Sequence, residues 1–145
     1  MELNAGRPAE ASEACREAHA TWESLAREKP SSGTFQLGLS MSYNLRGRLA
    51  QDGGRLTDAL RDLREALAIR KRLFERDGAF TEYRRELAQS YHNLGRLQLR
   101  MGCPAEAARS LKQAYELRLT YTGDNPDDLV SLACGLALRG APPAG

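Results

Sequence analysis

An internal repeat constrains the fold of this chain more than any other feature of its sequence. When the sequence is shifted by 48 positions, residues 39–74 align with residues 87–122 without a gap, and twelve columns are identical. In the first copy the identical residues are Leu39, Ser42, Tyr43, Gly47, Arg48, Leu49, Gly54, Ala59, Arg61, Leu63, Ala66 and Arg70. The same shift carries residues 6–25 onto the middle of the chain. Such a period implies that copies of one supersecondary unit are stacked along the chain.

Each copy of the repeat predicts two amphipathic helices. Apolar residues in steps of three and four predict one helix over residues 56–74 and another over about 83–101. Gly102 follows the last apolar residue of the second helix and predicts its end, and Pro104 predicts the start of the next helix. No segment shows the alternation of a β-strand. The sequence therefore predicts an all-α fold of five or six helices, arranged as repeated antiparallel helix pairs.

The repeat also predicts the domain organisation. The 145 residues suit one domain. We expect a single repeat domain over 1–145, with the second helix of a partial repeat at about 7–28, full repeats at about 35–77 and 82–122, and a last partial repeat at about 125–140. Such a chain would leave apolar helix faces unpaired at both ends. We therefore expect either a fragment of a longer array or a protein that self-associates through its ends.

The residues at fixed places in the second full copy resemble the tetratricopeptide repeat. Its first helix carries the aromatic residue, leucine and glycines in the family's spacing: Tyr91, Leu94, Gly95 and Gly102. Its second helix carries small and large apolar residues in the family's spacing: Ala107, Leu111 and Ala114. The resemblance extends from Gly6 to Pro142 and implies a right-handed, non-catalytic solenoid. Its members usually bind a protein or peptide on the concave face lined by the first helix of each pair, helix A.

Two features depart from the usual family pattern. Arg46 stands where the next copy has Leu94, and the unit of 48 residues is longer than the usual length of about 34. Lengthened units of this kind, and the segment DDLVSLACGLAL, resemble the repeats at the C-terminal end of some bacterial serine/threonine protein kinases and related signalling proteins. An alternative function is therefore the regulatory or interaction tail of such a kinase.

The resemblance places a candidate partner-binding surface on the two full A helices. The predicted contact residues are Asn44, Arg48, Gln89, His92, Arg96 and Arg100. Arg48 and Arg96 share a repeat column, so their guanidinium groups would line up and fork onto the carboxylates of an acidic segment. His92 has no cysteine or carboxylate at metal-ligand spacing on its helix, so we expect a groove contact there and not a zinc ligand or a base. His19 aligns with columns of the helix core, and we expect it to be a packing residue.

The distribution of charge leaves a second alternative function open. Residues 46–100 carry 13 basic and 8 acidic side chains, although the net charge of the whole chain is only +2. A helical repeat that binds nucleic acid through this central charge is therefore an alternative, and the low net charge weighs against it. The alternating charges of residues 61–65 are expected on a solvated helix face.

The remaining sequence features predict neither a cofactor nor a metal. The three cysteines stand far apart without the spacing of a zinc site or a disulfide framework, and no phosphate-binding or nucleophile motif is present. Residues 1–11 lack the basic and apolar regions of a signal peptide, and the longest apolar stretch, at 129–138, is too short to span a membrane. We therefore expect a cytoplasmic protein without a membrane anchor.

Overall fold

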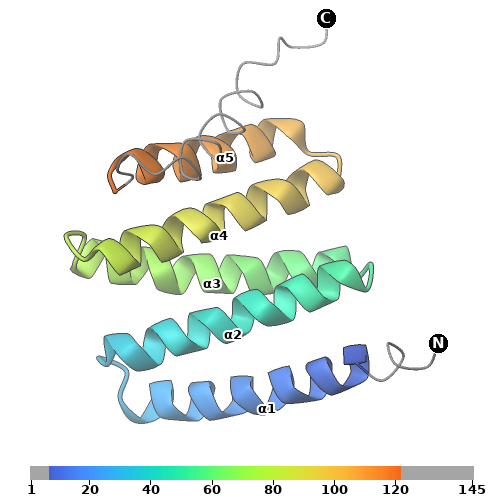
Figure 1. Cartoon of the computed structure of the whole chain (residues 1–145), viewed down its shortest axis with the longest axis vertical. Helices are drawn as coiled ribbons and strands as arrows, with labels where there is room; N and C mark the ends of the chain where they lie inside the picture. Colours follow the sequence, from blue (N-terminus) through green and yellow to red (C-terminus); the bar gives the residue numbers. More distant parts are fainter. Residues whose placement is uncertain (1–6, 122–145) are drawn as a thin grey trace, which may run out of the picture. The chain divides into compact units, whose positions relative to one another are not determined.

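The all-α prediction is confirmed by the computed structural model of the chain, which describes residues 7–121 (Figure 1). Within this range the chain forms five helices and no strand. The helices are α1 (Arg7–Glu28), α2 (Gly33–Asp52), α3 (Leu56–Arg76), α4 (Thr81–Arg100) and α5 (Pro104–Leu119). The partial repeat predicted at about 125–140 lies outside the described residues, and the right-handed stacking of successive pairs stays a prediction.

The described residues fall into two compact units, with the boundary between Leu73 and Phe74. The first unit contains α1, α2 and most of α3, and the second contains α4 and α5. Consecutive helices within each unit run in opposite directions (Figure 1). Each unit therefore contains the antiparallel pairing that the repeat predicts.

A glycine of one helix lies against a large side chain of the next in each unit. A Cβ atom on Gly47 of α2 would lie 3.0 Å from Cδ2 of Leu63 on α3. A Cβ atom on Gly95 of α4 would lie 2.7 Å from Cγ of Leu111 and 3.3 Å from the carbonyl oxygen of Ala107, both on α5. Gly95, which stands in the family's spacing, therefore marks a close approach of α4 and α5, and Gly47 marks one of α2 and α3 in the same repeat column.

The first unit has a further close contact between α1 and α2. A Cβ atom on Gly38 would lie 2.4 Å from Cε3 of the Trp22 ring. Only a glycine leaves room for the indole at this point, because any side chain would overlap it. The tryptophan therefore fixes the distance between α1 and α2.

Polar contacts show that the helix pairs are antiparallel over most of their length. In the second unit, Ser110 Oγ donates to Gln98 Oε1 at 2.7 Å near the turn, and Arg84 Nη1 donates to the carbonyl oxygen of Thr120 at 3.0 Å at the far end. In the first unit, the buried Arg70 donates from Nε to Ser40 Oγ at 3.0 Å, well away from the turn between α2 and α3. Each helix therefore packs along its partner and does not merely cross it.

The two turns within these pairs have the same backbone geometry. Gly54 and Gly102 have φ angles of +78° and +79°, in the left-handed region that favours glycine. The amide of Arg55 donates to the carbonyl oxygen of Ala50, and that of Cys103 to the carbonyl oxygen of Gln98, both at 2.8 Å. These bonds satisfy carbonyl groups left free at the helix ends. The predicted stop at Gly102 is confirmed, and α5 begins at the proline that follows.

We expect Gly95→Ala to lower the free energy of unfolding by about 1–3 kcal/mol, because Leu111 must shift to admit the new methyl group. At a solvent-exposed helix position, a change from glycine to alanine would instead raise the free energy of unfolding by about 1 kcal/mol, because alanine has the higher helix propensity. Urea denaturation followed by circular dichroism measures the difference. Gly53→Ala is the matched control, since a Cβ atom there would meet no atom closer than 3.5 Å. A stabilised Gly95→Ala variant would contradict the packing argument.

Candidate functional site

Two of the predicted partner-binding residues, Asn44 and Arg48, lie on α2. Arg48 is exposed, as a contact residue should be. Asn44 is only 7% exposed, so its predicted position on an open face is wrong. The exposed stripe of α2 instead runs through Met41, Leu45 and Arg48. Asn44 lies one residue, about 100° around the helix, from Leu45, which is enough to turn its amide inward.

Met41 and Leu45 are surface residues that the sequence analysis missed. Their exposed fractions are 54% and 44%, although they are large and apolar. Apolar residues at a spacing of four normally indicate a buried face, so the pattern of α2 alone gives no warning. The repeat does carry a signal, because the same columns of the next copy hold the polar residues Gln89 and Asn93.

The other four predicted residues lie on one helix, α4. Gln89, Arg96 and Arg100 are exposed, and the side chain of His92 is half-buried. Burial lowers the pKa of His92, and the nearby guanidinium groups of Arg118 and Arg96 lower it further. The imidazole is therefore neutral at neutral pH.

Arg118 of α5 also belongs to this group. From the sequence it was known only as the residue that aligns with Arg70 in the repeat. We call these five residues the basic face: Gln89, His92, Arg96, Arg100 and Arg118. It combines cationic groups from two helices of one unit with a neutral ring and an amide. Arg48 belongs to the other unit, so its predicted alignment with Arg96 stays a prediction.

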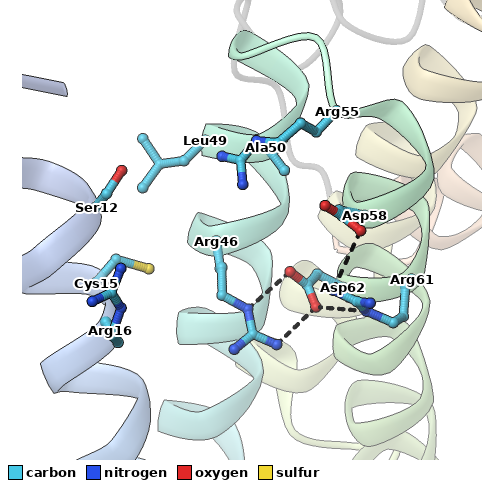
Figure 2. Close-up of a pocket in the computed structure, with 10 residues that line it drawn as sticks. All are labelled: Ser12, Cys15, Arg16, Arg46, Leu49, Ala50, Arg55, Asp58, Arg61 and Asp62. Atoms are coloured by element: carbon cyan, nitrogen blue, oxygen red, sulfur yellow. Dashed lines mark hydrogen bonds and ion pairs between the residues drawn. The ribbon is translucent and has the colours of Figure 1, made fainter. Parts of the chain in front are cut away.

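An ion pair in the first unit occupies two repeat columns that carry no charge in the next copy. Arg46 of α2 donates from Nε and Nη2 to the two carboxylate oxygens of Asp62 on α3, each at 2.9 Å (Figure 2). The Asp62 side chain is 3% exposed, so its predicted place on a solvated face is wrong. Hydrogen bonding to Asp62 raises the pKa of Arg46. In the next copy the two columns hold Leu94 and Ser110, a residue pair without charge.

His19 is a packing residue, as its repeat column predicts. The side chain is buried, with Nδ1 2.8 Å from Ser42 Oγ and Nε2 3.4 Å from the Glu23 carboxylate. Its ring meets the edge of the Tyr43 ring at a centroid distance of 4.5 Å. Burial is the main cause that lowers the pKa of His19. The ring therefore holds α1 against α2 as a neutral group.

The described part of the chain offers no metal centre. Among residues 7–121, no three His, Cys, Asp or Glu side chains are grouped so that they could hold a metal ion. Within the same range, no helix combines the length and the apolar character needed to cross a membrane.

The comparison with family models decides the identity of the repeat. Residues 38–120 match the model of the tetratricopeptide repeat. The chain belongs to the tetratricopeptide repeat family. The matched segment contains most of α2 and all of α3, α4 and α5, and so both of the helix pairs closed by a glycine turn. A search of curated proteins gave no match.

Tetratricopeptide repeats are in general non-catalytic modules of protein–protein interaction. In the family's terms, α2 and α4 are A helices, and α3 and α5 are the B helices that pack on them. The exposed residues of α2 and α4 are therefore the first place to look for partner contacts. Arg46 still departs from the family pattern, because the next copy has Leu94 in its column. The ion pair with Asp62 explains how an arginine is accommodated there.

The Arg46–Asp62 pair allows a stability test of this tetratricopeptide unit. In the test, the two residues are replaced by those that stand in the same columns of the next unit, leucine and serine. We expect Arg46→Leu alone to lower the free energy of unfolding by about 2–3 kcal/mol, because it leaves a buried carboxylate without its main partner. Arg61 limits the loss, since its Nε stays 3.7 Å from Asp62. We expect the double variant Arg46→Leu/Asp62→Ser to recover to within about 1 kcal/mol of the native chain. Equal losses in the single and double variants, measured by urea denaturation, would refute this account.

Proposed function

We propose that this tetratricopeptide chain is a protein-interaction module whose A helices bind an acidic segment of a partner protein. The observation that carries the proposal is the basic face, where Arg96 and Arg118 lie close enough to His92 to lower its pKa. Arg96 makes no ion pair with any carboxylate among the described residues, and neither does Arg48. Both guanidinium groups are therefore available to a partner.

The chemistry of the exposed groups supports an acidic partner. A guanidinium offers a planar fork of donors that matches the two oxygens of a carboxylate. The amide of Gln89 can donate and accept hydrogen bonds with a peptide backbone. On α2, Met41 and Leu45 lie in the same exposed stripe as Arg48 and offer apolar contact area. Acidic side chains of a partner suit the arginines of each A helix, and apolar side chains suit the exposed stripe of α2.

A second candidate function is the C-terminal tail of a bacterial serine/threonine kinase. The lengthened unit of 48 residues favours it. In that setting the chain would be the non-catalytic part of an enzyme and would recruit substrates or regulators through the same exposed helices. Affinity purification of the native protein followed by mass measurement tests this, because a tail would be recovered as part of a much larger polypeptide.

The role of the arginines can be tested with labelled peptides. We expect short Glu-rich peptides to bind the full chain more tightly than matched Gln-rich peptides, as measured by fluorescence anisotropy. We expect Arg48→Ala/Arg96→Ala to weaken that binding about tenfold, because it removes one charge-assisted donor from each A helix.

The control is Arg64→Ala/Arg109→Ala, which removes one exposed arginine from a B helix of each unit. Equal weakening by both double variants would count against the A helices as the binding surface. Tight binding of single-stranded RNA that falls steeply with salt would instead favour the nucleic-acid alternative.

The low pKa of His92 predicts a pH dependence of this binding. In the free chain, burial and two guanidinium groups keep the imidazole neutral. A carboxylate docked beside it would favour the charged form and raise the pKa, so binding would be accompanied by proton uptake. We expect affinity for the Glu-rich peptide to rise as the pH falls from about 7.5 to about 5.5, above the range in which the peptide itself is protonated. His92→Gln should give a flat profile, and an unchanged slope in that variant would exclude His92 as the source.

A further inference from the structure

A pocket opens in the first unit between α1, α2 and the beginning of α3 (Figure 2). Its volume is about 430 Å³, within the range of sites that hold small molecules. Six charged residues line it: Arg16, Arg46, Arg55, Asp58, Arg61 and Asp62. The pocket is distinct from the exposed face of the A helices to which the partner segment is assigned.

The charges of the pocket do not cancel. Asp62 accepts both hydrogen bonds of Arg46, and Arg61 lies 3.6 Å from the Asp58 carboxylate. These contacts balance two guanidinium groups against two carboxylates. Arg16 and Arg55 remain, and neither pairs with a carboxylate among the described residues.

The two unbalanced arginines approach the pocket from different walls. Arg16 lies on α1, and Arg55 lies in the turn that precedes α3 (Figure 2). The pocket therefore carries a surplus of two positive charges, on the exposed residues Arg16 and Arg55, and the buried Asp62 and Cys15 also line it. A concave site with a surplus of charge of one sign concentrates ligands of the opposite sign.

The comparison between the two units indicates that the Arg46–Asp62 ion pair of the pocket is not needed for this fold. The second unit packs the same columns with Leu94 and Ser110, and its helices pair with the same glycine contact and the same turn. Replacing a buried ion pair by uncharged residues of suitable shape is often neutral or stabilising. A neutral pair serves the same fold in the second unit. The charged pair of the first unit therefore indicates a role other than stability.

We propose that this pocket binds a small organic acid through its oxyanion, a carboxylate or a phosphate, held by Arg16 and Arg55. Each guanidinium donates a planar fork that matches two oxygens of either group. Arg46 also lines the pocket, and its Nη1 group, which is not used in the bonds to Asp62, can supply a third donor. Leu49 and Ala50, on the α2 side, provide apolar surface for the carbon skeleton of the ligand.

The test uses succinate and inorganic phosphate as separate probes for the two oxyanions. Each is titrated into the isotope-labelled full chain, and nuclear magnetic resonance follows the backbone amides and the arginine Nε–H signals. We expect saturable shifts at Arg16, Arg55 and Arg46 with at least one probe. Arg16→Gln/Arg55→Gln should weaken that binding about tenfold or more, since it removes both principal donors.

The matched control is Arg64→Gln/Arg72→Gln, which removes two exposed arginines of the same unit that do not line the pocket. Arg64 also occupies the repeat column of Arg16. This control should bind within about twofold of the native chain, as expected for residues outside the contact. The spectra themselves report whether each variant is folded.

Several results would overturn the proposal. The absence of saturable shifts at the pocket with both probes would do so. Equal shifts at Arg64 and Arg72 would reveal a diffuse counterion effect in place of a site. Shifts at the pocket with the Glu-rich peptide but with neither small acid would assign it to the partner protein. Because peptide binding is tested separately with Arg48→Ala/Arg96→Ala, failure here leaves the proposed function standing.

Discussion

The contact between an A-helix glycine and a B-helix leucine is the constraint on which the rest of the structure depends. Gly47 meets Leu63 and Gly95 meets Leu111; a Cβ atom would overlap Leu111 at Gly95 and would lie in tight contact with Leu63 at Gly47. The helix axes of each pair can approach closely only because these positions are empty. Once this distance is set, the antiparallel direction and the turn determine which residues of each A helix face outward. The exposed stripe of α2 and the basic face of α4 and α5 are consequences of that contact.

The features that sequence predicted well are those set by local rules and repeated in both copies. The helices themselves, the end of α4 at Gly102 and the start of α5 at Pro104 depend on short-range geometry, and the helical pattern recurs in both copies of the repeat. Asn44 and Asp62 could not be predicted in this way. The burial of Asn44 depends on the exact rotation of α2 within its packing. Asp62 resembles part of a solvated charge run until Arg46, sixteen residues earlier on another helix, is placed beside it.

The two units show that one backbone arrangement accepts different chemistry in the same columns. The first unit holds a two-point ion pair of 2.9 Å bonds between its A and B helices. The second unit buries Leu94 there, and Ser110 donates to Gln98 instead. Both solutions satisfy the polar atoms they bury, and so both are compatible with the fold. The sequence pattern showed Arg46 to be unusual, but only its position opposite Asp62 explains how a cation is tolerated in a leucine column.

The matching turns at Gly54 and Gly102 bear on how such a chain can change over time. Each helix pair carries its own turn and its own glycine contact, with φ angles that agree within 1°. A genetic crossover in the segment between α3 and α4 would therefore transfer a complete pair without cutting through either turn. Recombination at that point yields intact building blocks, whereas a crossover inside a pair separates a glycine from its leucine. Selection would accordingly preserve breakpoints between pairs and let whole pairs, with their different inner chemistry, be exchanged.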